Sequence, residues 1–198
     1  MKIRMMLGAV LLCGAVAFPA AAQFGQVERT QAEIALEQAE TRMAKQKIDR
    51  DAATAACSAG DLEGCFKLAE MQRTGIGGAQ DLKGAAASYK KMCDGKDGRG
   101  CSGLAYLTVQ GRGVAENKTE GRALYQKACD YGDVSGCAAY GNMAYTGTGG
   151  RKDVLAGTDA LTKACNREYE WACNRMRELG VYDPTENPFD RLRDLRGN

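Results

Sequence analysis

Apolar, small and turn-forming residues recur along this chain with a period of 36 positions. Counted from a cysteine, the units are Cys65–Gly100, Cys101–Gly136 and Cys137–Ala172, followed by a partial unit from Cys173. Each unit keeps a bulky residue, then two glycines, then Asp or Asn at fixed positions. The bulky residues are Leu68, Leu104, Tyr140 and Met176; the glycines are Gly75, Gly77, Gly111, Gly113, Gly147 and Gly149; the capping residues are Asp81, Asn117 and Asp153. A period of this length is typical of helical repeats that stack into a solenoid.

Each unit is expected to contain two helices. The first opens near the second cysteine of a pair, as in residues 101–110, and ends at the glycines, because glycine tolerates the left-handed conformation that closes a helix. The Asp or Asn then caps the second helix with a side-chain oxygen. Many helical positions are Ala or Gly, so a single unit buries too little apolar surface to fold alone. We expect the helices between residues 57 and 180 to stack mostly antiparallel.

The N-terminal part of the chain divides into a leader and a capping segment. Residues 1–22 join a basic start to an apolar stretch and end in Ala20-Ala21-Ala22, the pattern of a secretory signal cut before Gln23. Within the capping segment, residues 23–56, positions 26–56 lack Gly and Pro and predict one long helix that leads into Cys57. A coiled-coil dimer is the less favoured alternative, because the apolar residues of this helix keep no clean heptad.

The C-terminal segment, residues 181–198, is expected to close the array. Asn187-Pro188 is typical of the start of a helix. Phe189, Leu192 and Leu195 follow at helical spacing and occupy the second-helix position of the partial fourth unit.

The cysteines agree with export. Beyond Cys13 in the leader, eight cysteines remain, in four pairs whose members lie eight residues apart: Cys57 and Cys65, Cys93 and Cys101, Cys129 and Cys137, Cys165 and Cys173. An even number of cysteines in an exported chain indicates structural disulfides, and no C-x-x-C points to a redox or zinc motif. Eight cysteines allow about 105 pairings, among which the repetition favours four equivalent local bridges. Their oxidation would depend on the thiol-oxidising machinery of a periplasm or of a secretion route.

The amino-acid composition excludes several classes of function. The chain has no histidine, which excludes Ser-His-Asp and Cys-His catalysis and any His-ligated metal. Without Lys2 and Arg4 of the leader, the 27 basic side chains become 25, equal to the 25 acidic ones. A net-neutral chain gives no electrostatic case for binding nucleic acid. Beyond the leader no segment is apolar enough to span a membrane, and no cofactor or metal is indicated.

The stretch Tyr125-Gln-Lys127-Ala-Cys129, followed by Asp133, Gly136 and Cys137, is the most specific in the chain. With the preceding Gly-x-Gly and Asp or Asn, it resembles the Sel-one-like repeat and, more narrowly, the disulfide-rich Helicobacter cysteine-rich proteins. The match covers about residues 57–180. The resemblance implies an all-α fold, a right-handed α/α solenoid related to tetratricopeptide arrays, with four disulfides between cysteines eight apart.

The chain departs from the repeat pattern in the third unit. Leu161 replaces the second-helix Tyr, and the turn after Cys165 lacks the glycine present at Gly60 and Gly132. These departures leave the predicted fold intact, but they weaken any transfer of a ligand from longer relatives.

A stacked helical array offers a curved inner face that binds peptides or proteins, so we expect a non-enzymatic binding scaffold. The partner-binding residues expected on the first helices are Arg73, Tyr106, Gln110, Asn142 and Tyr145. The alternative for the two tyrosines is packing against a neighbouring helix, and packing is also expected for Trp171, the single tryptophan. A further hypothesis places binding on the N-terminal helix, with the repeats as a rigid spacer. The sequence does not identify the partner, which could be a protein, a peptide or cell-wall material.

The resemblance also implies an enzymatic alternative, because some cysteine-rich relatives have been described as penicillin-binding proteins or weak β-lactamases. Ser88-Tyr-Lys-Lys91 matches S-x-x-K, but the S-D-N and K-T-G elements of that class are absent from the sequence. The repeat already explains Lys91, since Lys127 and Lys163 occupy the same position. No catalytic residue is therefore assigned.

Overall fold

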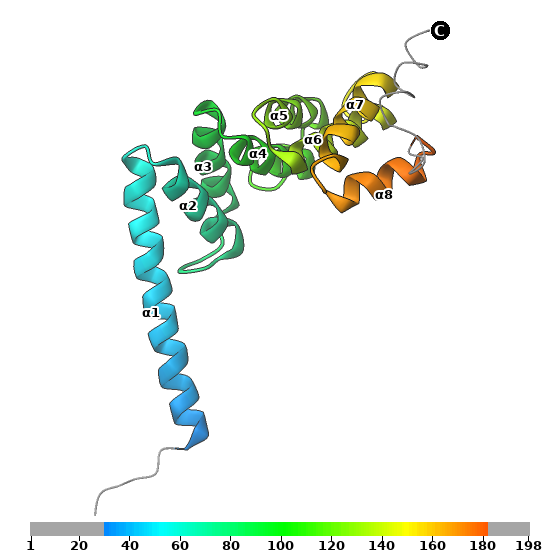
Figure 1. Cartoon of the computed structure of the whole chain (residues 1–198). Helices are drawn as coiled ribbons and strands as arrows, with labels where there is room; N and C mark the ends of the chain where they lie inside the picture. Colours follow the sequence, from blue (N-terminus) through cyan, green and yellow to red (C-terminus); the bar gives the residue numbers. More distant parts are fainter. Residues whose placement is uncertain (1–29, 182–198) are drawn as a thin grey trace, which may run out of the picture. The chain divides into compact units, whose positions relative to one another are not determined.

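The computed structural model describes residues 30–181, in which all regular structure is helical (Figure 1). The helices are α1 (Gln31–Ser58), α2 (Leu62–Thr74), α3 (Leu82–Asp94), α4 (Gly98–Gln110), α5 (Lys118–Asp130), α6 (Val134–Thr146), α7 (Val154–Cys165) and α8 (Glu170–Glu178). The leader at residues 1–22 and the closing helix expected near Phe189 lie outside the described residues. Within 30–181, no helix is both long and apolar enough to cross a membrane. Two compact units are distinguished, Met1–Ala39 and Glu40–Asn198, and the repeats belong to the second.

The predicted start and stop signals operate in every complete unit. The first helices α2, α4 and α6 end at Gly75, Gly111 and Gly147, each in the left-handed conformation. The second helices α3, α5 and α7 begin after Asp81, Asn117 and Asp153, whose side chains accept the backbone N–H three residues on. The first helices open three residues before the second cysteine of each pair, as Leu62 and Cys65 show, because Asp61, Asp97 and Asp133 cap them there.

A second set of glycines lets each loop approach the second helix of the preceding unit. A Cβ added to Gly113 would lie 2.4 Å from the carbonyl oxygen of Leu82, and one added to Gly149 would lie 2.2 Å from that of Lys118. Gly77 meets the carbonyl oxygen of Gln46 on α1 in the same way, at 2.3 Å. The C-terminal part of α1 therefore lies against Gly77 as the second helices lie against Gly113 and Gly149.

The core is a series of small residues packed between successive helices. The largest fully buried side chains include Met92, Leu107, Leu161 and Met176. Close approach near the first three disulfides depends on another glycine (Gly64, Gly100 and Gly136), since a Cβ on Gly100 would lie 2.2 Å from the Cβ of Met92. Helices that follow one another in the chain pack together from α2 to α8 (Figure 1).

The four local disulfides are confirmed. They join Cys57 to Cys65, Cys93 to Cys101, Cys129 to Cys137 and Cys165 to Cys173, with Cα atoms 4.3–4.8 Å apart. Each bridge links the end of one helix pair to the start of the next. The turn inside each bridge needs one left-handed residue, which is glycine at Gly60 and Gly132 but Lys96 and Glu168 in the other two. The missing glycine after Cys165 thus leaves the turn unchanged in form.

Candidate functional site

A shallow groove of about 490 Å³ crosses the first helices of consecutive units. Its wall is continuous along the stack because the same face of α2, α4 and α6 contributes to it. Tyrosines from α3, from α5 and from the start of α8 complete the wall. The lining residues are Phe66, Glu70, Tyr89, Arg99, Ser102, Gly103, Tyr106, Tyr125, Asp133, Ser135, Ala139 and Tyr169. Four tyrosines, three charged residues and two serines in one groove provide both ring surface and hydrogen-bonding groups for a ligand.

At the end formed by the first unit, the polar groups satisfy one another. The Tyr89 hydroxyl donates to Glu70, and Arg73 donates to the same carboxylate at 2.5 Å. Burial acts to raise the pKa of Glu70, but the hydrogen bonds from Arg73 and Tyr89 outweigh it and hold that pKa below its ordinary value. Burial, reinforced by the Glu70 carboxylate, raises the pKa of Tyr89. This part of the groove is therefore closed by its own side chains.

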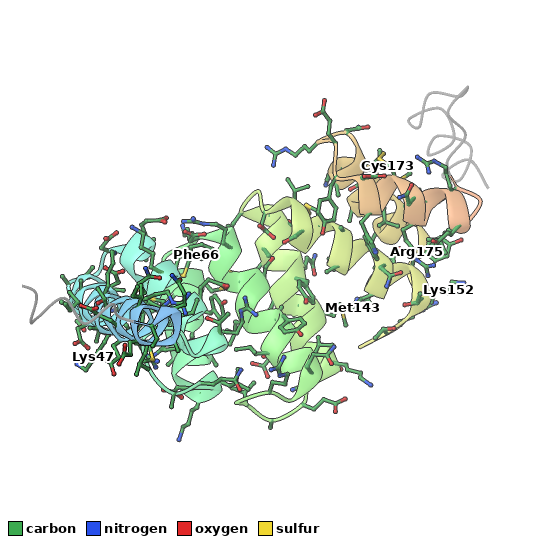
Figure 2. All side chains as sticks on the ribbon, turned by 90° about the horizontal axis from the view of Figure 1, so that it is seen from below. Lys47, Phe66, Met143, Lys152, Cys173 and Arg175 are labelled. Carbon is green, nitrogen blue, oxygen red and sulfur yellow. A yellow bond between two sulfur atoms is a disulfide. The ribbon has the colours of Figure 1, made fainter. Side chains whose placement is uncertain are left out.

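The Arg99 guanidinium is likewise occupied by side chains of its own chain at the first unit. Its guanidinium contacts Asp97 at 2.8 Å and Glu63 at 3.0 Å, and lies 4.6 Å from the ring centroid of Phe66. The hydrogen bond from Arg99 holds the pKa of Asp97 below its ordinary value. Phe66, labelled in Figure 2, thus has its ring face covered by a cation from the same chain.

The second unit leaves its groove-lining tyrosines open. Tyr125 is the repeat equivalent of Tyr89, but Tyr106 stands where the first unit has Glu70, so the Tyr125 hydroxyl has no matching carboxylate. Among the described residues nothing hydrogen-bonds to the Tyr125 hydroxyl, and Tyr106 is 41% exposed with one long contact, 3.4 Å from Arg112. Burial, with smaller effects of Tyr106 and Asp133, raises the pKa of Tyr125 to about 12. Tyr125 is therefore a neutral hydroxyl donor at physiological pH.

Outside the groove lining, Asn142 and Arg175 connect the third and fourth units. The Arg175 Nε donates to the Asn142 Oδ1 at 2.8 Å, and its Nη1 pairs with Glu178 at 2.8 Å. Arg175 is labelled on α8 in Figure 2. Asn142 is thus occupied by a residue of its own chain.

The structure distributes the five predicted binding residues unequally. Of Arg73, Tyr106, Gln110, Asn142 and Tyr145, Tyr106 alone lines the groove. Arg73 donates a hydrogen bond to the Glu70 carboxylate. The ring centroid of Tyr145 lies 5.3 Å from the Lys152 ammonium, and Tyr145 packs beside Gly157. Gln110 is exposed at the end of α4, outside the groove lining.

Sequence reasoning missed Ser102, Tyr125, Asp133 and Tyr169. Two signals were available: Ser102 lies four residues before Tyr106 on the same helix face, and Tyr125 belongs to the repeat motif itself. The packing expected of Trp171 is wrong, because this side chain is 47% exposed.

The S-x-x-K pair does not form a nucleophile–base arrangement. Ser88 is buried and donates its hydroxyl to Gln72 at 2.9 Å, while the Lys91 ammonium donates to the backbone carbonyl of Cys57 at 2.6 Å. A serine nucleophile needs its base within hydrogen-bond reach, and here both groups bond elsewhere. Across the part of the chain that the structure describes, no group of three or more metal-ligating side chains occurs.

A larger cleft, about 760 Å³, lies between α1 and α2. It marks the place where the first helix of a preceding unit would pack, since α1 acts there as a second helix. Small side chains such as Ala52, Ala53 and Ala56 line it on α1, so the larger side chains in it, such as Phe66 and Met71, come from α2. The groove across the units is the better candidate site.

The fold and the four bridges define a disulfide-stapled α/α solenoid. Similar solved structures are a Sel1 repeat protein from Oxalobacter formigenes (24% identity, TM-score 0.58, 64% of this chain and 95% of that one) and the cysteine-rich protein B of Helicobacter pylori (25%, 0.54, 67% and 95%). A protective antigen of uropathogenic Escherichia coli with the SLR fold is similar at 20% identity and a TM-score of 0.61 over 75% of this chain, which spans 36% of that protein's length. No protein-family model and no curated protein matches the sequence. The likeness to Sel-one-like repeat proteins and the all-α solenoid expected from the sequence are confirmed.

Proposed function

We propose that this protein is an exported, non-enzymatic scaffold that binds an extended segment of a partner protein in the groove across α2, α4 and α6. The observation that carries the proposal is the run of open groups at the second unit: the Tyr125 hydroxyl, the Tyr106 ring and Tyr169. A ligand lying there would cover aromatic surface and supply the missing hydrogen-bond acceptor. Exposed tyrosines are frequent binding hot spots, since they provide large contact area at low entropic cost.

The fold supports a peptide rather than a small molecule as ligand. The groove is shallow and extends over several repeat units, whereas small-molecule sites are concave and enclose most of the ligand. An extended peptide leaves its backbone carbonyls free to accept hydrogen bonds from groups such as the Tyr125 hydroxyl.

The compartment is part of the proposal. Four disulfides in a chain of this size are typical of oxidising environments, and the leader expected at residues 1–22 would deliver the protein to one. We place the protein in the periplasm or outside the cell, where thiol-oxidising machinery would form the bridges.

The test is a selection of peptides from a random library on the oxidised protein, followed by measured affinities of the selected peptides for variants. Tyr106→Ala in the groove should weaken binding at least about tenfold, as expected for a hot-spot residue. Gln126→Ala, on an exposed position of α5 outside the groove lining, should leave the affinity unchanged.

Two results would contradict the proposal. One is the absence of any enriched peptide. The other is binding that survives Tyr106→Ala but is lost in Met43→Ala, a change at a residue of α1 that is 57% exposed, because binding would then belong to the N-terminal helix.

A further inference from the structure

Asp133 is the charged group in the groove without an ion pair in the described part of the chain. As the cap of α6 it uses one oxygen, Oδ1, which accepts the Gly136 N–H at 2.6 Å, the Ser135 hydroxyl at 2.7 Å and the Ser102 hydroxyl. No described residue donates to its Oδ2. The carboxylate is therefore anchored by one oxygen and available at the other.

The repeat explains why Asp133 lacks a cation. Its equivalent one unit earlier, Asp97, is paired with Arg99, two residues further on in the chain. In the next unit the residue two positions after the cap is Ser135, and no described cation forms an ion pair with Asp133; the nearby Arg167 guanidinium donates instead to the backbone carbonyl of Gly132 at 2.9 Å. Arg99 itself does not compensate, because its guanidinium is bound to Asp97 and Glu63.

Aromatic rings line the groove beside this carboxylate. Tyr106, Tyr125 and Tyr169 line the same groove as Asp133 and come from three different helices or their caps. Among the described residues none of these three rings has a cation over its face, whereas Phe66 in the first unit is covered by Arg99. Rings around an accessible negative group are the arrangement that proteins use to hold an organic cation.

We infer that the groove centre accepts a basic side chain, lysine or arginine, of the bound partner segment, with its alkyl stem against Tyr106, Tyr125 and Tyr169 and its charge at the Oδ2 of Asp133. This inference rests on the proposed function and adds the chemistry of the partner. An incoming cation would restore the carboxylate–cation pair that Arg99 provides in the first unit.

The test uses three blocked synthetic pentapeptides, identical except for a central Arg, Gln or Glu between alanines. Their binding is followed by amide chemical shifts of the isotope-labelled, oxidised protein at low salt. The Arg peptide should shift the amides of Ser135 and Tyr106 and bind at least about tenfold more tightly than the Gln peptide, the size typical of a hydrogen bond to a charged group. The Glu peptide should bind least.

Asp133→Asn is the discriminating variant, because Asn is also a good helix cap, as Asn117 shows in this chain. It should remove the preference for Arg over Gln while leaving the fold intact. Asp81→Asn, which changes the cap of α3 outside the groove, is the matched control and should leave the preference unchanged.

The outcomes separate the inference from the proposed function. Equal binding of the Arg and Gln peptides in the groove would overturn the inference that the groove accepts a basic side chain, and so would a preference for Arg that survives Asp133→Asn. Either result would leave the proposed peptide-binding groove in place. If none of the three peptides shifts groove amides, the basic-side-chain inference is overturned, and the library selection decides the proposed function separately.

Discussion

The first and second repeat units have the same backbone scaffold, but they differ in the side chains at their groove. Those of the first unit bond to one another, and those of the second unit do not. Both keep a left-handed glycine at the end of the first helix, a capping Asp or Asn and a disulfide. In the first unit, Tyr89, Glu70 and Arg73 bond to one another; in the second, Tyr106 and Val109 occupy the positions of Glu70 and Arg73, and Tyr125 is left open. Backbone positions are thus fixed by the repeat, whereas the side chains at two positions, Glu70 or Tyr106 and Arg73 or Val109, decide whether a unit closes on itself or faces a ligand.

The largest expected effect tests the shared scaffold. Each bridge closes a loop whose cysteines are eight residues apart. Loop-closure entropy predicts that such a bridge stabilises the folded state by about 2.6 kcal/mol. Breaking all four would remove roughly 10 kcal/mol, as much as the whole stability of a typical domain. Reduction under native conditions should therefore unfold the array, measured by loss of helical circular dichroism.

Removing one bridge at a time compares the stability that the disulfides give to the different units. Cys93→Ala/Cys101→Ala and Cys129→Ala/Cys137→Ala should each lower the free energy of unfolding by roughly 2–3 kcal/mol in urea titrations. A large difference between the two would show that the scaffolds of the units are not equivalent.

Glycine substitutions separate backbone strain from close packing. Gly113→Ala should cost about 3 kcal/mol, because its φ is +76° and the new Cβ would lie 2.4 Å from the backbone of Leu82. Gly132→Ala has a similar φ of +84°, but the nearest neighbour of the new Cβ would be the Arg167 Nη1 at 3.9 Å, an ordinary contact, so about 1 kcal/mol is expected. Thermal unfolding of the two variants measures the difference, and equal losses would contradict the close approach between units.

The same position should matter for stability in one unit and not in the other. Glu70→Ala leaves the hydroxyl of buried Tyr89 without its acceptor and should cost about 2 kcal/mol. Tyr106→Ala, at the equivalent exposed position, should cost less than about 0.5 kcal/mol. Urea titration compares them, and a similar loss at both sites would show that the second unit is closed too.

A smaller effect is expected in alkaline solution. The pKa of Tyr125 is raised to about 12 in the folded protein, against about 10 in an unfolded chain. Its contribution to stability is thus fully present below pH 10 and is lost as the pH rises toward 12. Tyr125→Phe should remove one late-titrating group from the phenolate absorbance curve and flatten the loss of stability in this window. Loss of a group that titrates near 10 instead would place Tyr125 in solvent.

The scaffold was predictable from the sequence because its determinants are local and repeated. Gly111 ends a helix, Asn117 caps the next one, and cysteines eight apart meet across a single turn. The groove was harder to predict, because it depends on which side chains from different helices converge. Arg73 and Asn142 are polar residues expected on the exposed face, but Glu70 on the same helix and Arg175 on α8 already engage them. The open state of Tyr125 follows from the absence of a carboxylate at position 106, a relation between two helices that periodicity alone does not show.

We propose that the second unit binds a partner because its groove positions are left open. The most direct test transfers the closed arrangement of the first unit into it with Tyr106→Glu/Val109→Arg, so that Tyr125 acquires the carboxylate and guanidinium that Tyr89 has. We predict a folded, equally stable protein whose affinity for library-selected peptides is lost. Retained affinity in this folded variant would show that the open groups of the second unit do not bind the peptide.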